Sequence, residues 1–124
     1  MRAGPDQVLP GMRYLLVDPE DDGAYRLQTG LNSIGRLPSN DIVLHEKSIS
    51  RRHCVVLIHA LGRSELHDTA SRNGTRVNGT YVRQLVGLKS GDRIDVCGRR
   101  LLFISERDWQ ASVENDSHAE TSWA

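Results

Sequence analysis

The 124-residue sequence has few aromatic residues, only two cysteines and no net charge. No apolar run approaches the roughly 20 residues of a membrane-spanning helix, and the first residues lack the apolar stretch of a secretory signal. We therefore expect a cytoplasmic protein. Neutrality argues against a nucleic-acid-binding protein, because such proteins usually carry a basic excess. Cys54 and Cys97 lie in apolar runs, so we expect buried thiols, with a single disulfide as the alternative.

The sequence also lacks the motifs of common catalytic and metal sites. It contains neither a Gly-x-Ser-x-Gly elbow nor a Gly-x-x-x-x-Gly-Lys loop. Four of its histidines are separated by eight, six and eight residues, which matches no compact metal-ligand motif; they are His45, His53, His59 and His67. We therefore predict a protein that is not an enzyme and uses no metal or cofactor. Tightly bound zinc together with catalytic turnover would contradict this prediction.

Charge is unevenly distributed along the chain. Residues 12–105 contain fourteen Lys or Arg and ten Asp or Glu, whereas residues 106–124 contain one basic and five acidic residues. A basic body beside an acidic end suits an anionic ligand, and also suits association between the two. Residues 106–124 show no sustained hydrophobic period, so we expect a disordered tail whose start Trp109 could anchor. Residues 1–11 are expected to form a flexible arm.

Short apolar segments separated by turn residues run through the rest of the chain. His53 to His59 is the most apolar of them and is typical of a strand buried on both faces. Asn78-Gly79 lies between two short segments and is a strong hairpin signal. Because no amphipathic helix is evident, we predict one all-β domain over residues 12–105, a β-sandwich. Its expected strands are 12–17, 24–28, 32–36, 41–44, 53–59, 64–68, 75–77, 80–82, 85–88, 93–96 and 101–105.

Three of the expected loops concentrate hydrogen-bond donors that suit a phosphate group. Arg36 follows a glycine at a strand end, Ser50-Arg51-Arg52-His53 precedes the apolar strand, and Ser71-Arg72-Asn73-Gly74-Thr75 precedes the hairpin. Arginine matches the geometry of phosphate, and such charge-assisted bonds are about twice as strong as neutral ones. Each segment alone has an ordinary explanation, as a solvated basic pair or a turn. Their joint occurrence predicts a site that holds a phosphate without acting on it chemically.

These segments, in this order, resemble the forkhead-associated (FHA) domain family. The matching stretches are Ile34-Gly35-Arg36, Asn40-Asp41-Ile42-Val43-Leu44, Ile49-Ser50-Arg51-Arg52-His53, Ser71-Arg72-Asn73-Gly74-Thr75, Val77-Asn78-Gly79 and Leu88-Lys89-Ser90-Gly91-Asp92-Arg93-Ile94. The resemblance covers about residues 12–105. It implies a β-sandwich of the SMAD/FHA type, with about eleven strands, that binds phosphothreonine peptides through loops at one end.

The resemblance also implies a role for each matching residue. Arg36 would grip the phosphate and the adjoining peptide, and the Ser50 hydroxyl would donate to a phosphate oxygen. Arg51 would supply its backbone N–H, Arg72 would lie near the phosphate, and Asn73 would hold the main chain of the ligand. Structural support would come from His53 beneath the binding loop, from the tight backbone at Gly35 and Gly74, and from Asn78 in the hairpin.

The function implied is a non-catalytic adaptor in signal transduction that binds a phosphothreonine-containing protein, such as a Ser/Thr kinase or its substrate. The alternative is a phosphate-independent scaffold or self-association module with the same sandwich fold. A further hypothesis concerns Thr121 in the acidic tail. If phosphorylated, it could occupy the site intramolecularly, because a tethered ligand has a high effective concentration.

Overall fold

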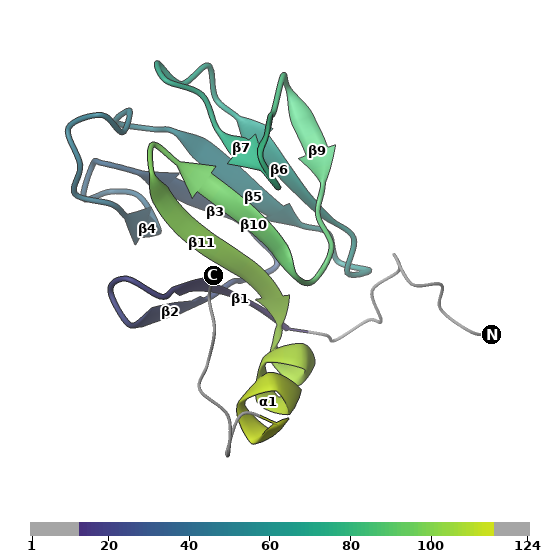
Figure 1. Ribbon diagram of the computed structural model, residues 1–124. Coiled ribbons are helices and arrows are strands. Elements are labelled where there is room, and N and C mark those ends of the chain that lie inside the picture. The colour runs from purple at the N-terminus through teal and green to yellow at the C-terminus, as the bar shows by residue number, and fades with distance from the viewer. Residues whose placement is uncertain (1–12, 116–124) are drawn as a thin grey trace.

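The computed structural model describes residues 13–115, which form two packed β-sheets and one helix (Figure 1). The six-stranded sheet has the order β2-β1-β11-β10-β7-β8, and the five-stranded sheet has the order β4-β3-β5-β6-β9. The predicted all-β sandwich is confirmed. Its elements are β1 (Tyr14–Asp18), β2 (Gly23–Arg26), β3 (Gly30–Gly35), β4 (Ile42–Val43), β5 (Cys54–Ile58), β6 (Ser64–Asp68), β7 (Arg76–Val77), β8 (Thr80–Tyr81), β9 (Leu85–Gly87), β10 (Asp92–Val96), β11 (Arg99–Ser105) and α1 (Glu106–Asn115).

The hydrophobic core lies between the two sheets, because alternate side chains of each long strand point inward. Its fully buried members include Leu16, Ile34, Val56, Leu66, Ile94 and Phe103. Tyr14 stacks on Phe103 with ring centroids 4.6 Å apart. In β5, Val55 and Leu57 are only half-buried. The expectation that this strand is buried on both faces is therefore wrong, because the second sheet covers only one face of β5.

Helix α1 replaces the disorder that we expected immediately after residue 105. The Ser105 hydroxyl accepts a hydrogen bond from the Asp108 N–H at 3.0 Å and so caps the helix. Glu106 and Asp108 place negative charge in the first turn, at the positive end of the helix dipole. The Ser-x-x-Asp spacing is a helix-start signal that could have been found in the sequence.

Trp109 anchors α1 to the outer face of the six-stranded sheet, as expected. It packs with Leu102 against Leu15, Val17 and Ile104, which point away from the main core. The expectation of a disordered tail is thus wrong for residues 106–115, because a cap and this apolar cluster stabilise a helix. The expected arm over residues 1–11 and the remainder of the acidic tail lie outside the described residues.

The Asn78-Gly79 hairpin is confirmed. Asn78 and Gly79 have φ angles of 51° and 87°, which suit the two central positions of a type I′ turn. The Asn78 side chain also donates to the Asp92 carboxylate and accepts from the Arg93 N–H, both at 2.9 Å. Asn78 therefore shapes the β7–β8 turn and joins it to β10.

Both cysteines are free thiols in the structure. Cys54 is buried in the core, and burial raises the pKa of its thiol to about 12. Cys97 is only half-buried, in the β10–β11 turn with a φ of 52°. The expectation of a buried Cys97 is wrong because the apolar run ends in a left-handed turn at the molecular surface. No helix in residues 13–115 is long and apolar enough to cross a membrane.

We predict that Asn78→Ala lowers the free energy of unfolding by roughly 1–3 kcal/mol, because it removes two hydrogen bonds and places alanine at a positive φ. Urea unfolding monitored by circular dichroism measures this effect. Asn78→Gly is the matched control, since it loses the same bonds but tolerates the backbone angle. It should be the more stable of the two variants. An alanine variant as stable as the parent protein would contradict the role of this turn.

Candidate functional site

Three loops meet at the end of the sandwich away from α1 (Figure 1). They connect β3 to β4, β4 to β5, and β6 to β7. The Arg36 N–H donates to the Ser50 carbonyl at 3.1 Å, and the Leu37 N–H donates to the Arg51 carbonyl at 3.2 Å. Gly35 permits this approach, because a Cβ there would clash with the Arg51 carbonyl oxygen. The first two loops are therefore held against each other by backbone contacts.

The side chain of Arg36 is exposed but is held at one nitrogen. Its Nε donates to the Ile49 carbonyl at 3.0 Å. Within the described part of the chain, no carboxylate forms an ion pair with its guanidinium. With respect to residues 13–115, its two terminal nitrogens are open for a ligand. A guanidinium oriented in this way is suited to bidentate bonds with a phosphate.

Ser50 connects the second loop to the third. Its hydroxyl oxygen accepts the Arg72 N–H at 2.9 Å. Because the oxygen acts as an acceptor in this bond, the hydroxyl proton remains available for donation. The N–H of the adjacent Arg51 has no acceptor within residues 13–115. Within residues 13–115, the Ser50 hydroxyl proton and the Arg51 N–H, which the resemblance assigns to the phosphate, are therefore both free to donate.

His53 lies beneath these donors and is fully buried. Its Nδ1 accepts the Ser50 N–H at 3.0 Å, and its Nε2 lies 2.8 Å from the Gly74 carbonyl. Accepting a backbone N–H requires an unprotonated Nδ1, so the proton is on Nε2 and is donated to Gly74. The neutral ring thus joins the β4–β5 loop to the β6–β7 loop. This geometry supports the bracing role that the resemblance implies.

Asp68 organises the β6–β7 loop and was not anticipated from the sequence. Its carboxylate accepts the Ser71 hydroxyl at 2.6 Å and the Thr75 hydroxyl at 2.7 Å. Burial acts to raise the pKa of Asp68, but these hydrogen bonds outweigh it and hold the pKa below its ordinary value. The signal was the Asp-x-x-Ser spacing, which is typical of a side-chain-closed turn.

Asn40, the first residue of the Asn40–Leu44 stretch, is a second residue that supports the site. It is buried, and its Nδ2 donates to the carbonyls of Leu37 and Arg51 at 2.9 and 2.8 Å. Asn40 therefore fixes the β3–β4 loop against the backbone of the β4–β5 loop. The side chain acts from beneath the site, on the same carbonyl that Gly35 approaches.

The Ser48 carbonyl, in the β4–β5 loop, accepts hydrogen bonds from both the β6–β7 loop and the β10–β11 turn. It accepts the Asn73 side-chain amide at 2.7 Å and the Cys97 thiol at 3.2 Å. As far as the described residues go, one amide hydrogen and the Oδ1 of Asn73 remain for a ligand main chain. Cys97 brings in the β10–β11 turn from the other sheet. No sequence signal indicates this contact, because it depends on how the sheets pack.

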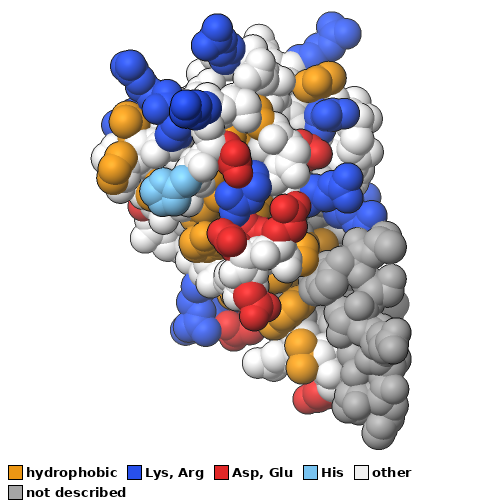
Figure 2. All heavy atoms as spheres, turned by 60° about the vertical axis from the view of Figure 1, so that its left-hand side comes forward, with side chains coloured by type: hydrophobic (Ala, Val, Ile, Leu, Met, Phe, Trp, Pro, Cys, Tyr) orange, Lys and Arg blue, Asp and Glu red, His pale blue; other side chains and the backbone are white. Residues whose placement is uncertain are grey.

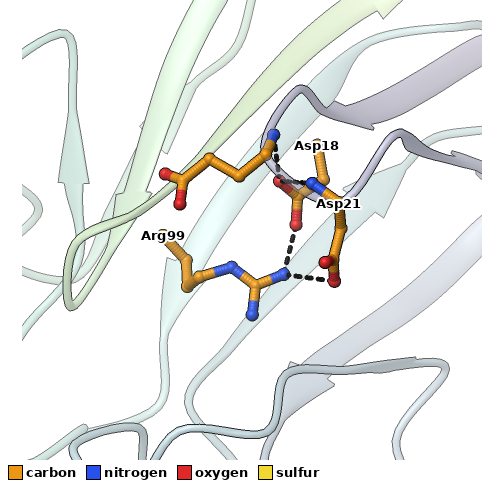
Figure 3. A network of polar contacts seen from close by, with 4 residues as sticks. Asp18, Asp21 and Arg99 are labelled. Atoms are coloured by element: carbon orange, nitrogen blue, oxygen red, sulfur yellow. Dashed lines mark hydrogen bonds and ion pairs between the residues drawn. The ribbon is translucent and has the colours of Figure 1, made fainter.

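Basic side chains gather at the loop end of the molecule, whereas acidic side chains lie lower on the same face (Figure 2). The exposed basic residues of the three loops are Arg36, Lys47, Arg51, Arg52 and Arg72. Asp18 at the end of β1 and Asp21 in the β1–β2 turn both bind Arg99 (Figure 3). The loop end therefore has an excess of positive charge that the neutral whole sequence conceals, and this favours an anionic ligand.

We predict that His53→Ala lowers the free energy of unfolding by roughly 2–4 kcal/mol, because it leaves a cavity and two unpaired backbone groups. Chemical denaturation measures this loss. Amide hydrogen exchange should become faster at Ser50 and across residues 71–74. His59→Ala is the control, since His59 is half-exposed and far from the loops. Unchanged exchange at Ser50 in the His53 variant would show that the ring does not hold the loop.

The fold and the loop cluster together define a recognition module that presents anion-binding groups on preformed loops. A family model described as the FHA domain matches residues 32–97. The chain belongs to the FHA domain family, whose members are non-catalytic phosphothreonine-binding modules. This confirms the resemblance seen in the sequence.

Similar curated proteins include three from Mycobacterium and Corynebacterium species. The chain is 37% identical to the transcriptional regulatory protein EmbR of Mycobacterium tuberculosis over 64% of its own length and 20% of EmbR. It is 34% identical to the oxoglutarate dehydrogenase inhibitor of Corynebacterium efficiens, covering 82% of the chain and 72% of the inhibitor. It is 31% identical to the glycogen accumulation regulator GarA of M. tuberculosis, covering 83% and 64%. The chain thus spans about a fifth of EmbR and slightly less than two thirds of GarA.

Solved structures with the same fold include phosphopeptide complexes. M. tuberculosis EmbR in complex with a low-affinity phosphopeptide superposes with a TM-score of 0.71 and 34% identity, over 74% of this chain and 24% of EmbR. A second structure, from a structural and functional analysis of phosphothreonine-dependent FHA domain interactions, has a TM-score of 0.70 and 29% identity. The match covers 74% of this chain and 95% of the chain in that structure.

Proposed function

We propose that this domain binds phosphothreonine-containing polypeptides and acts as an adaptor in cytoplasmic Ser/Thr kinase signalling. One observation carries the proposal: the Arg36 N–H donates to the Ser50 carbonyl, and within residues 13–115 neither the two terminal guanidinium nitrogens of Arg36 nor the Ser50 hydroxyl proton has a partner. A kinase or a kinase substrate is the natural partner, because phosphorylation creates the ligand. Phosphopeptide binding by the related EmbR supports this assignment.

The roles of the individual residues follow from their unused donors. Arg36 binds the phosphate bidentately, and Ser50 and the Arg51 N–H donate to its remaining oxygens. Arg72 is exposed at the rim and adds positive charge, while the free amide groups of Asn73 bind the peptide backbone. Glutamate or aspartate in place of the phosphothreonine would bind poorly, because a carboxylate offers less charge and fewer oxygens.

We predict that Arg36→Ala weakens phosphopeptide binding by roughly 2–5 kcal/mol, because it removes one partner of a charge pair that is desolvated in the complex. Isothermal titration with a phosphothreonine peptide measures the loss. Arg63→Ala is the matched control, since Arg63 is also exposed but lies in the β5–β6 turn. Both variants should unfold at the same denaturant concentration as the parent protein. Undiminished affinity in the Arg36 variant would refute the proposed phosphate site.

Binding of two matched peptides distinguishes this proposal from the alternative, a phosphate-independent scaffold. The phosphorylated and unphosphorylated forms of one threonine peptide are titrated against the same protein. The adaptor requires a large preference for the phosphorylated form. Equal affinities would instead favour the scaffold, because the sandwich alone would then provide the binding surface.

We also propose that phosphorylated Thr121, which lies outside the described residues, competes for this site from within the same chain. The support is the positive charge of the loop end and the tether, which raises the local concentration of an anionic segment. Because α1 lies at the other end of the sandwich, this competition requires α1 to leave its place against β1 and β11. Protein phosphorylated at Thr121 should bind an external phosphopeptide more weakly than unmodified protein does. Thr121→Ala treated with the same kinase is the control. Equal binding before and after phosphorylation would exclude self-inhibition.

A further inference from the structure

A second basic surface lies on the outer face of the six-stranded sheet. A groove of about 450 Å³ is lined by Arg76, Arg93 and Arg100 from three different strands. In the register of the sheet, Arg76 and Arg100 lie on either side of Asp95, and Arg93 lies opposite Leu102. All three arginine side chains are exposed. The groove is separate from the three loops of the proposed phosphate site.

Among the described residues that line this groove, three arginines outnumber one carboxylate, that of Asp95. The Asp95 carboxylate accepts the Gly98 N–H at 2.9 Å, and no ion pair within residues 13–115 involves any of the three arginines. The guanidinium of Arg76 lies over the Tyr81 ring, 5.1 Å from its centroid. Leu102 adds an apolar wall. The groove thus offers fixed positive charge beside apolar surface, which suits an acidic polypeptide segment.

The β10–β11 turn connects this groove to the phosphate site. Its Cys97 thiol bonds to Ser48 in the β4–β5 loop, and Arg99 is held by Asp18 and Asp21 (Figure 3). Asp95 and Arg100 lie two residues from the turn, or about 7 Å along the strands. An extended peptide advances about 3.3 Å per residue, so a few residues suffice to cross from Ser48 to the groove.

We propose that the groove is a second recognition site for acidic residues of the same phosphorylated polypeptide. This inference rests on the proposed function. The path runs from Ser50 to Ser48, across the Ser48–Cys97 contact, and along the strands to the groove, which is roughly 15–25 Å in all. The acidic residues would therefore lie about five to eight extended positions from the phosphothreonine. The ligand class is therefore a phosphothreonine segment with an acidic stretch on one side. Since exposed ion pairs are individually weak and screened by salt, the contribution should be modest and salt-dependent.

The test uses the full chain and three phosphothreonine peptides of equal length. One has a block of glutamates at the predicted distance on the amino-terminal side, one has it on the carboxyl-terminal side, and one has glutamines in both places. At about 0.05 M salt, one of the acidic peptides should bind about fivefold more tightly than the glutamine peptide. At about 0.5 M salt, the difference should largely disappear.

Two charge-matched variants locate the effect. Arg93→Gln with Arg100→Gln should remove the gain from the acidic block while binding the glutamine peptide as the parent protein does. Arg63→Gln with Arg107→Gln has the same net charge but alters exposed residues elsewhere, and it should keep the gain. Unchanged binding of the glutamine peptide by both variants also shows that they are folded.

Each other outcome overturns the inference. No gain from either acidic block shows that the groove does not contact the ligand, including the case in which the acidic tail or a second copy of the chain already covers it. A gain that persists in the Arg93 and Arg100 variant places the acidic contact elsewhere. If the unphosphorylated glutamine peptide binds as well as the phosphorylated one, the proposed function itself fails, a result distinct from the other two.

Discussion

The buried imidazole of His53 is the constraint on which the rest of the site depends. One ring accepts a backbone N–H from Ser50 and donates to the Gly74 carbonyl, which only the neutral Nε2–H form can do. The two loops concerned have no regular secondary structure of their own. Their relative position is therefore fixed by this ring, by the Ser50–Arg72 bond above it and by the Asp68 network beside it. Loops held in this way bind with a smaller loss of conformational entropy.

Charge separation is the second property on which function depends. The whole sequence is neutral, but the structure pairs Asp18 and Asp21 with Arg99 and leaves the loop arginines unpaired within the described residues. An anionic partner therefore meets positive charge at the loop end and on the outer face of β10 and β11. Such a field increases the rate of encounter, while in the proposed function the short-range donors at Arg36 and Ser50 determine which partner is retained.

Local patterns in the sequence were sufficient to locate the strands but did not reveal the helix. Alternation and turn residues located all eleven strands, and Asn78-Gly79 specified its hairpin because both residues tolerate a positive φ. Helix α1 was missed although Ser105 and Asp108 have the spacing of a cap, since only three of its ten residues are apolar, namely Trp109, Ala111 and Val113. What stabilises α1 is Trp109 on a cluster formed by β1 and β11, which no local window contains.

The sequence by itself determined the fold class and family of this protein, and the residue types available to bind a phosphate, because these are recorded in local spacing and order. The tertiary structure alone decided how those residues are held. Asn40 beneath Arg51, Asn73 and Cys97 sharing the Ser48 carbonyl, and three arginines lining one groove all join segments far apart in the chain. Such contacts arise from the pairing and packing of strands, and side-chain patterns along one strand do not encode them.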